Sequence, residues 1–248
     1  MKKEKEITHI GKVAALYRYP VKSMRGQSLE AVEVGWHGFL GDRRYAFVKT
    51  GNKSRFPWLT AREIPTLVRY VPSFVDPADP TTSVIMVQTP DGHEIEVEAE
   101  ELLAEVQTLY GKAAHLAQSN RGNFDSLSLS IITTATLQTL GQHLDSQFEG
   151  RQFRQNIVIE NLDGEPFAEE SWLGGALVFG EGEEAVRIRA NKRIKRCMMV
   201  NLDPETGKQN PAILREIVQT RELCLGIHGT SQQTGQLRVG DRVRLVRN

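Results

Sequence analysis

Residues 84–97 read Val-Ile-Met-Val-Gln-Thr-Pro-Asp-Gly-His-Glu-Ile-Glu-Val and set the pattern for the chain. Two β-prone runs flank residues 90–92, where proline presets φ for a turn and glycine accepts a left-handed backbone. In the second run His93, Ile95 and Val97 alternate with glutamates, which is typical of a strand with one buried face. The stretch therefore predicts two strands joined by a tight turn.

Short strands bounded by turn residues recur on both sides of this stretch. We expect further strands at 13–19, 29–34, 44–49, 67–74, 156–160, 176–179, 186–190, 194–201 and 242–246. Apolar residues at helical spacing predict helices at 99–110 and 133–144, and a proline near its start marks a third at 211–219. Short strands separated by turn signals favour a barrel or a sandwich. The prediction is a mainly β chain with a few helices and two barrel-like units.

Composition excludes several classes of protein. The 248 residues carry 31 Lys+Arg and 31 Asp+Glu, and this balance argues against general nucleic-acid binding, which needs an excess of cations. Cys197 and Cys224 are too few for a disulfide scaffold, a four-cysteine zinc site or a four-thiolate iron–sulfur cluster. Without a signal segment or an apolar run of about 18 residues, we expect a cytoplasmic protein with no membrane partner.

Cys197 is the most informative residue, because it follows the densest basic run of the chain, residues 192–196. Neighbouring cations favour the thiolate form of a cysteine, which is both a nucleophile and a metal ligand. If this segment is an extended strand, Lys195, Cys197 and Met199 share one face, and Arg196 points to the other. A buried structural cysteine beside a charged edge strand is the alternative. The residues alone leave both roles open.

Three loops place cations where they could bind an anion. Residues 20–26 combine two cations with a hydroxyl, a set that suits a phosphate, although the segment taken alone favours a solvated turn. Residues 41–44 predict either a buried Arg–Asp pair or a second anion clamp. Residues 153–156 could bind a polar ligand or cap a strand edge. His228 could line a pocket, whereas the apolar neighbours of Cys224 indicate packing.

An ordered set of segments resembles a known family. The segments are Tyr-Pro-Val-Lys-Ser at 19–23, Gly-Asp-Arg-Arg-Tyr at 41–45, Leu-Thr-Ala-Arg-Glu-x-Pro at 59–65, Phe-Arg-Gln-Asn-Ile-Val-Ile at 153–159, Arg-Cys-Met at 196–198, Leu-Asp-Pro-Glu-Thr-Gly at 202–207 and Val-Gly-Asp-Arg-Val at 239–243. Together they resemble the MOSC proteins, named for the C-terminal domain of molybdenum cofactor sulfurase. The resemblance is strongest to the two-part form found in the amidoxime-reducing components.

The resemblance implies a domain organisation and a cofactor. It implies an N-terminal MOSC β-barrel domain at 7–120, packed on a MOSC β-barrel domain at 121–248. It implies a pterin-based molybdenum cofactor in which Cys197 is the catalytic metal ligand. The implied cofactor-binding residues are Lys22, Ser23, Arg43, Thr133, Arg154, Asn156 and Arg196. Pyridoxal phosphate is not expected, because it belongs with the aminotransferase-like half of the sulfurase, which this chain lacks.

The resemblance also implies a reaction, and two departures concern its substrate. Lys195 stands where relatives often have serine, and residues 225–229 replace a Phe-Gly-Gln-like segment. The implied reaction is two-electron reduction of N-hydroxylated or other N-oxygenated small molecules. Electrons would come from a separate ferredoxin, cytochrome b5-type protein or flavin reductase. The alternatives are a sulfur carrier or cofactor carrier that uses Cys197 without turnover, and an adaptor in which Cys197 is only packed.

Overall fold

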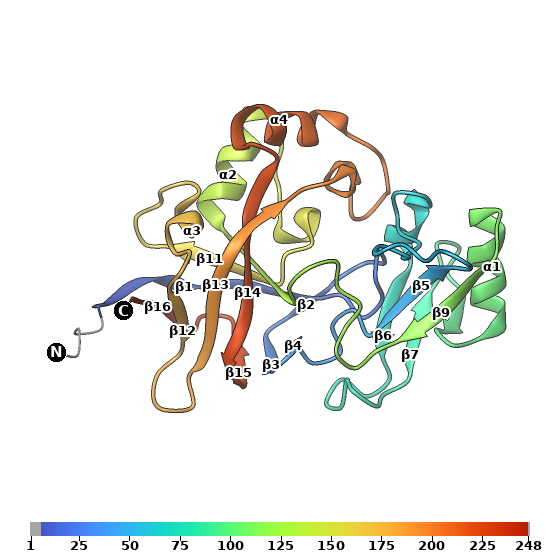
Figure 1. Cartoon of the computed structure of the whole chain (residues 1–248), viewed down its shortest axis with the longest axis horizontal. Helices are drawn as coiled ribbons and strands as arrows, with labels where there is room; N and C mark the ends of the chain where they lie inside the picture. Colours follow the sequence, from blue (N-terminus) through green and yellow to red (C-terminus); the bar gives the residue numbers. More distant parts are fainter. Residues whose placement is uncertain (1–5, 248) are drawn as a thin grey trace.

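The structure is a computed structural model that describes residues 6–247, and its main feature is one closed β-barrel (Figure 1). Seven strands follow one another around the barrel in the order β11-β10-β14-β13-β12-β16-β1, and β1 closes the ring on β11. β10 and β11 run parallel, and the other pairs are antiparallel. The strands are β1 (Glu6–Arg18), β10 (Leu129–Thr133), β11 (Ile157–Asn161), β12 (Ala176–Phe179), β13 (Val186–Lys195), β14 (Cys224–Gln233) and β16 (Arg242–Arg247).

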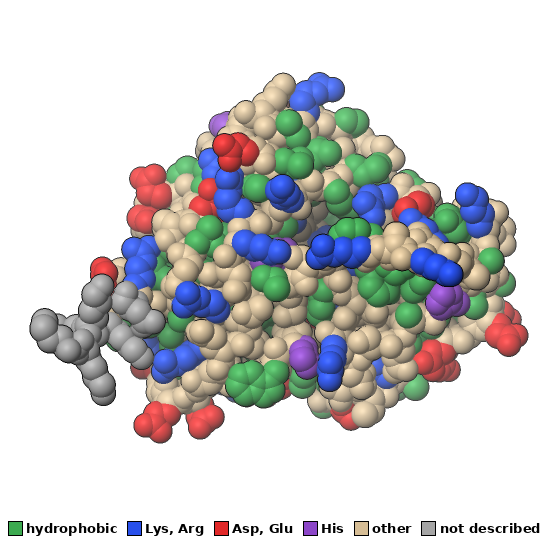
Figure 2. All heavy atoms as spheres, in the orientation of Figure 1, with side chains coloured by type: hydrophobic (Ala, Val, Ile, Leu, Met, Phe, Trp, Pro, Cys, Tyr) green, Lys and Arg blue, Asp and Glu red, His purple; other side chains and the backbone are tan. Residues whose placement is uncertain are grey.

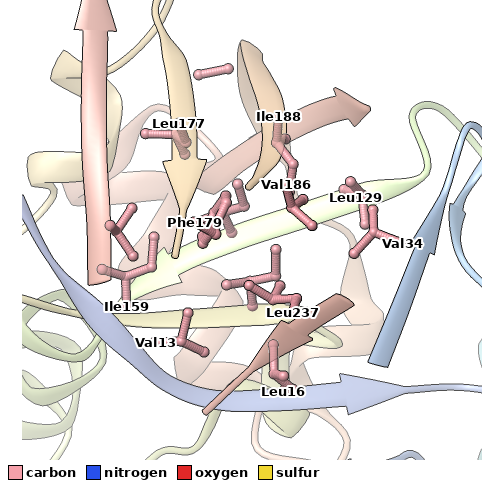
Figure 3. Close-up of a cluster of buried hydrophobic side chains, with 14 of the residues drawn as sticks. Val13, Leu16, Val34, Leu129, Ile159, Leu177, Phe179, Val186, Ile188 and Leu237 are labelled. Atoms are coloured by element: carbon pink, nitrogen blue, oxygen red, sulfur yellow. The ribbon is translucent and has the colours of Figure 1, made fainter. Parts of the chain in front are cut away.

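Alternating side chains build the barrel interior. In β13, Val186, Ile188 and Ala190 are buried, while Arg187 and Arg189 between them are partly exposed. Period-two alternation of this kind places one set of side chains inside a barrel and the other on its outer surface. Apolar side chains from all seven barrel strands fill the interior, as Figure 3 shows for a part of the cluster. Burial of this cluster is what makes the closed ring stable.

β1 joins the first residues of the chain to strands from its second half. It pairs with β16 on one side and with β11 on the other, and its far end also pairs with β2 (Gln27–Leu29). Without β1 the ring would have two open edges at β16 and β11. The expected boundary at residue 120 therefore does not separate two barrels in space, because the barrel of the second half takes a strand from the first.

The rest of the first half does not form a second closed ring of paired strands within residues 6–247. Its strands lie in three short sheets instead, the first of which includes one strand of the second half. The sheets are β3 (Ala31–Gly35) and β4 (Gly38–Phe39) with β15 (Gly235–Arg238), β5 (Tyr45–Lys49) with β9 (Ala114–Gln118), and β6 (Val71–Phe74) with β7 (Ile85–Gln88) and β8 (Glu94–Glu96). A second hydrophobic core joins the last two sheets and α1 (Glu100–Tyr110). The prediction of a mainly β chain is confirmed, and the prediction of two barrel-like units holds for one of them.

The structure confirms the predicted hairpin at 84–97 and the predicted helices, which rest on patterns within a few residues. β7 and β8 pair antiparallel across the predicted turn, with Met86 opposite Glu96. All three predicted helices are present: α1, α2 (Thr134–His143) and α4 (Pro211–Arg221). The expected strand at 67–74 is shorter, because the 3-10 helix η1 (Pro65–Arg69) occupies its first part. No helix within residues 6–247 is long and apolar enough to cross a membrane.

The remaining short helices lie next to the barrel. They are η2 (Gly150–Phe153), α3 (Ala168–Ser171) and η3 (Met198–Asn201). A third hydrophobic cluster packs α2 and α4 against the outside of the barrel and includes Tyr19, Phe153 and Val200. This cluster places the ends of β1, η2 and η3 side by side, and these ends carry the polar residues described next.

Candidate active site

A cleft of about 240 Å³ brings together segments from the whole length of the chain. Its lining comes from the loop after β1, the loop before β5, residues 124–130, η2, and the end of β13 with η3. In the space-filling view, Lys and Arg side chains form a band across the middle of one face, beside a hollow (Figure 2). Cations therefore gather where the cleft opens.

Seven of the eight predicted site residues line this cleft. They are Lys22, Ser23, Arg43, Arg154, Asn156, Arg196 and Cys197. Thr133, the eighth, is not among the residues that line the cleft. Its side chain is fully buried, and Thr133 Oγ1 donates to Glu169 Oε2 at 2.9 Å and accepts from the Thr136 amide at 3.2 Å. Thr133 is thus the N-cap of α2, where its hydroxyl satisfies a free backbone amide.

Cys197 is exposed at the end of β13, which rules out the alternative of a buried structural cysteine. The expected strand at 194–201 is wrong beyond Lys195, because a 3-10 turn begins there: the Val200 amide donates to the Cys197 carbonyl at 3.2 Å. Lys195 and Cys197 therefore do not share one face of a continuous strand, although both line the cleft. Cys224 is buried, as predicted.

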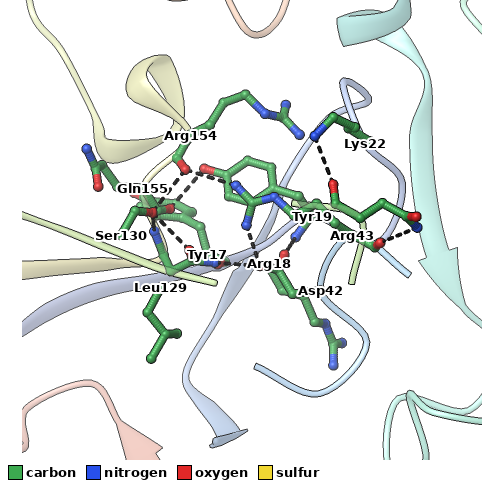
Figure 4. A network of polar contacts seen from close by, with 12 residues as sticks. Tyr17, Arg18, Tyr19, Lys22, Asp42, Arg43, Leu129, Ser130, Arg154 and Gln155 are labelled. Atoms are coloured by element: carbon green, nitrogen blue, oxygen red, sulfur yellow. Dashed lines mark hydrogen bonds and ion pairs between the residues drawn. The ribbon is translucent and has the colours of Figure 1, made fainter. Parts of the chain in front are cut away.

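Tyr19 is the centre of the polar network beneath the cleft (Figure 4). The guanidinium carbons of Arg43 and Arg154 each lie 4.3 Å from the centroid of its ring. Tyr19 Oη donates to the Gln155 carbonyl at 3.0 Å, and the Tyr19 amide donates to Asp42 Oδ1 at 2.7 Å. A fully buried aromatic ring with its hydroxyl satisfied is a rigid support for two cations.

Asp42 ties the two halves of the site together. Its carboxylate accepts hydrogen bonds from the Arg43 guanidinium and, at 2.9 Å, from Asn156 Nδ2. Asn156 Oδ1 accepts from Ser130 Oγ at 2.9 Å, so the Asn156 amide is engaged at both ends. The loop at 41–44 thus holds the buried Arg–Asp pair that the sequence allowed, and Asn156 holds the buried Asp42 carboxylate next to Arg43, which lines the cleft.

Lys22 reaches the cleft from a partly polar environment. Its Nζ donates to the Asn123 carbonyl at 2.8 Å, forms an ion pair with Asp125 Oδ1 at 3.0 Å and lies 5.3 Å from the centroid of the Trp58 ring. Burial lowers the pKa of Lys22 to about 8, and the charge of Asp125 opposes this shift. Lys22 is therefore still mostly protonated at pH 7.

Arg154 and Arg196 each keep one donor free for a ligand. Arg154 Nη1 donates to the Met24 carbonyl at 2.7 Å, and Arg196 donates to the carbonyls of Leu225 and Phe153 at 2.8 and 2.9 Å. The Nη2 atom of each is buried and has no hydrogen-bond partner among residues 6–247. Burial lowers the pKa of both guanidinium groups to about 10, so both stay charged at pH 7. Unsatisfied buried donors are costly, and an anionic ligand would satisfy them.

Backbone strain is concentrated at the same place. Ser23, Arg43 and Arg154 have φ values of 70°, 47° and 52°, which are uncommon for residues with a side chain. Such conformations persist only where the surroundings enforce them, and they cluster at ligand-binding sites. Strain at three residues of one cleft supports a binding role for it.

Sequence reasoning missed part of the lining. Thr60 and Arg62 line the cleft, as do residues 124–128, none of which was predicted as a site residue. The run of serines just before a buried strand was the available signal. His228 also lines the cleft, as expected, and its Nδ1 donates to the Leu129 carbonyl at 3.2 Å. Burial and nearby cations lower the pKa of His228 to about 4, so its imidazole is neutral at pH 7.

The donor set restricts the kind of metal site. Within the described part of the chain, no group of three His, Cys, Asp or Glu side chains could hold a metal ion. A metal in this cleft would have Cys197 as a protein ligand and would need further ligands from a bound group. A sulfur-rich organic ligand fits this requirement, because Cys197 already supplies a soft sulfur donor.

The chain is similar to known proteins along nearly its whole length. Mitochondrial amidoxime-reducing component 1 of Mus musculus is 23% identical over an alignment of 302 positions, gaps included, which covers 99% of this chain and 85% of the relative. The Homo sapiens counterpart is 25% identical, with coverage of 97% and 84%. The solved structure of the YuaD protein from Bacillus subtilis covers 98% of this chain and 99% of its own, with a TM-score of 0.53 and 11% identity, and so shows the fold alone.

Two family models match the chain, and the ranges that they match overlap at residues 120–148. The model of the MOSC N-terminal beta barrel domain matches residues 10–148, and that of the MOSC domain matches residues 120–244. Each covers at least half of the chain, and together they span both the barrel and the second core. The chain therefore belongs to the MOSC family, with the N-terminal beta barrel domain and the MOSC domain in one polypeptide.

Proposed function

We propose that this protein binds a pterin-based molybdenum cofactor in the cleft and uses it to reduce N-hydroxylated or other N-oxygenated small molecules. The observation that carries the proposal is the exposed thiol of Cys197 in a cleft where Arg154 and Arg196 each keep one unsatisfied guanidinium nitrogen. The distant similarity to the amidoxime-reducing components supports the same assignment.

The residues of the cleft divide into a metal ligand and anion-binding groups. Cys197 Sγ would ligate the molybdenum, since a thiolate suits a soft metal centre. Arg154 and Arg196 would bind the phosphate or the pterin acceptors through their free nitrogens, and guanidinium groups match such oxygens well. The hydroxyl of Ser23 and the ammonium of Lys22 line the same cleft and add two donors.

The cofactor would supply the two-electron redox chemistry that cleavage of a nitrogen–oxygen bond requires. The chain's own residues would bind and orient the reactants. His228 is neutral and donates its Nδ1 proton to Leu129, so Nε2 is left as a hydrogen-bond acceptor for an N–OH group. With only two cysteines the chain cannot build a four-thiolate cluster, so electrons would come from a separate ferredoxin, cytochrome b5-type protein or flavin reductase.

Metal analysis of matched cysteine variants tests the proposal. Protein made in a host that synthesises the cofactor is measured for molybdenum by mass spectrometry and for reduction of benzamidoxime with a chemical electron donor. Wild type and Cys224→Ala should carry near-stoichiometric molybdenum and reduce the substrate. Cys197→Ser should lose both properties, although its folding stability should change little because the side chain is exposed.

Each other outcome has a definite meaning. Full metal content and activity in Cys197→Ser would show that Cys197 is not the ligand. Cofactor-loaded wild type that reduces no N-hydroxylated compound would be a carrier, in which Cys197 holds the cofactor or a sulfur atom without turnover. Wild type that takes up no molybdenum would exclude both the reductase and the cofactor carrier, and would leave the sulfur carrier.

A further inference from the structure

We infer that the substrate carries a negative charge in addition to its N-oxygenated group, and that Lys195 and Arg62 bind this charge at the exposed edge of the cleft. The inference rests on the proposed function and names the substrate class of the same site. The charges around the cleft, the partners of each cation and the positions of the two free cations support it.

The cleft has a large excess of positive charge. Six lysine and arginine residues line it, against one acidic residue, Asp125. The six are Lys22, Arg43, Arg62, Arg154, Lys195 and Arg196. His228 adds no charge at neutral pH, since burial lowers its pKa to about 4. A ligand in this cleft therefore meets a strongly positive field.

The protein's own acids do not cancel this excess. Lys22 is paired with Asp125, and Arg43 with Asp42. Four of the six cations are left. The phosphate of a cofactor carries about two negative charges, so these four cations exceed what a phosphate needs. Two cations are therefore left for a second anionic group.

Lys195 and Arg62 are the outer cations, and both side chains are exposed. Neither forms an ion pair with any acidic side chain of residues 6–247 at the 4.0 Å limit that defines the other pairs. Arg62 Nε donates to Thr60 Oγ1 at 3.2 Å, which fixes the base of its guanidinium. The nearby Glu63 is engaged by Lys49 and by the Thr60 hydroxyl. The Lys195 ammonium and the terminal nitrogens of the Arg62 guanidinium are thus available to a ligand.

Position relates Lys195 to the reacting centre. It is the last residue of β13 and precedes Cys197 by two residues, a separation of at most about 7 Å along the backbone. Lys195 and Cys197 also line the same cleft, so the lysine lies in the wall that carries the expected metal ligand. A substrate that presents a carboxylate or phosphate to Lys195 and Arg62 would have its N-oxygenated end directed inward.

A matched pair of substrates tests this charge preference. Benzamidoxime is neutral at pH 7, and 4-carboxybenzamidoxime differs from it by one carboxylate. Wild type should show a kcat/KM about tenfold higher for the carboxylate, an effect expected of an ion pair that is partly desolvated. The ratio should fall toward one in the double variant Lys195→Gln with Arg62→Gln, and Lys195→Glu should invert it. Added salt should reduce the wild-type ratio.

Lys112→Gln is the matched control, because Lys112 is exposed and does not line the cleft. Its ratio should equal that of wild type. Molybdenum content is measured for every variant. Normal molybdenum in Lys195→Gln would place Lys195 with the substrate, whereas a loss of molybdenum would mean that Lys195 holds the cofactor and would overturn the inference.

A binding measurement separates this inference from the proposed function. Titration calorimetry with 4-carboxybenzamide and benzamide, which contain no N–O bond, reports the charge preference without turnover. Tighter binding of 4-carboxybenzamide to wild type than to the double variant would support the inference, whether or not the amidoximes are reduced. Failure to reduce either amidoxime would contradict only the proposed function. Equal kcat/KM values for the two amidoximes, or equal binding of the two amides, would overturn the inference.

Discussion

Arg43 Nη2 donates a hydrogen bond to the backbone carbonyl of Arg154 at 3.1 Å, although the two residues are 111 positions apart in the chain. This contact holds two like charges side by side against the ring of Tyr19. Such an arrangement is unfavourable unless opposite charge and aromatic surface compensate it. The compensation comes from Asp42 and Tyr19, and it leaves Arg154 free to bind a ligand.

The buried carboxylate of Asp42 should therefore be a main source of stability. Asp42→Asn removes the charge that offsets Arg43, while Arg154 stays next to it. We expect the free energy of unfolding to fall by about 3–5 kcal/mol, as for other buried pairs that lose one partner. Urea denaturation would measure this. Glu160→Gln is the control, because its exposed pair with Lys12 should contribute less than about 1 kcal/mol. Equal losses in the two variants would contradict this account.

Tyr19 should support ligand binding through its ring more than through its hydroxyl. Tyr19→Phe keeps the ring under Arg43 and Arg154 and loses one hydrogen bond to Gln155, at a cost of about 0.5–1.5 kcal/mol. Tyr19→Leu removes the aromatic surface from both arginines. Calorimetry with inorganic phosphate should show near-normal affinity for the phenylalanine variant and roughly fivefold weaker binding for the leucine variant. Equal affinities would mean that the ring does not position the guanidinium groups.

Glu169 should make the stability of the fold depend on pH. Burial raises the pKa of Glu169 above the ordinary value of 4.5, so the folded protein holds this proton more tightly than the unfolded chain. Its contribution is complete below about pH 4.5 and is lost as pH rises through the folded-state pKa. Glu169→Gln copies the protonated form and keeps an acceptor for the hydroxyls of Thr133 and Thr136.

Melting temperatures across pH 5–8 would test the role of Glu169. The glutamine variant should gain stability relative to wild type as pH increases. The exposed residue Glu101 supplies the control, since Glu101→Gln should follow the wild-type curve. A constant difference between Glu169→Gln and wild type at every pH would argue against a buried, proton-linked carboxyl group.

Gly226 should tolerate no side chain, because it lies against the site. Its φ is 72°, and an added Cβ would lie 2.8 Å from Gln155 Nε2 and 2.8 Å from the Ile131 carbonyl oxygen. Gly111 has a φ of 74° with open space around it, so Gly111→Ala reports the cost of the backbone conformation alone. We expect Gly226→Ala to lose about 1–3 kcal/mol more than Gly111→Ala in urea denaturation. Similar losses would show that the neighbours of Gly226 can move aside.

Much of the local structure was predictable from the sequence. The turn at 90–92, a short strand within 93–97 and the three helices follow from signals within a few residues, and the structure has them. The predicted burial of one strand face holds for Val97 and in part for Ile95, whereas His93 is exposed. Cys197 could also be selected as a candidate, because a basic run next to a cysteine is a pattern in the order of residues alone. The order of weak motifs identified the family, although no single motif would have done so.

Only the tertiary structure decided how these parts meet. The pairing of β1 with β11 and β16 closes the barrel across more than a hundred residues, and no local signal encodes such a partner. Thr133 caps a helix, Cys197 is exposed by a 3-10 turn, and Arg62 reaches the cleft from a distant loop. Periodicity and turn chemistry act over a few residues, whereas burial and charge pairing depend on which distant segments fold against each other. The residue types of the site could therefore be predicted from the sequence, whereas the contacts that decide their roles depend on long-range packing.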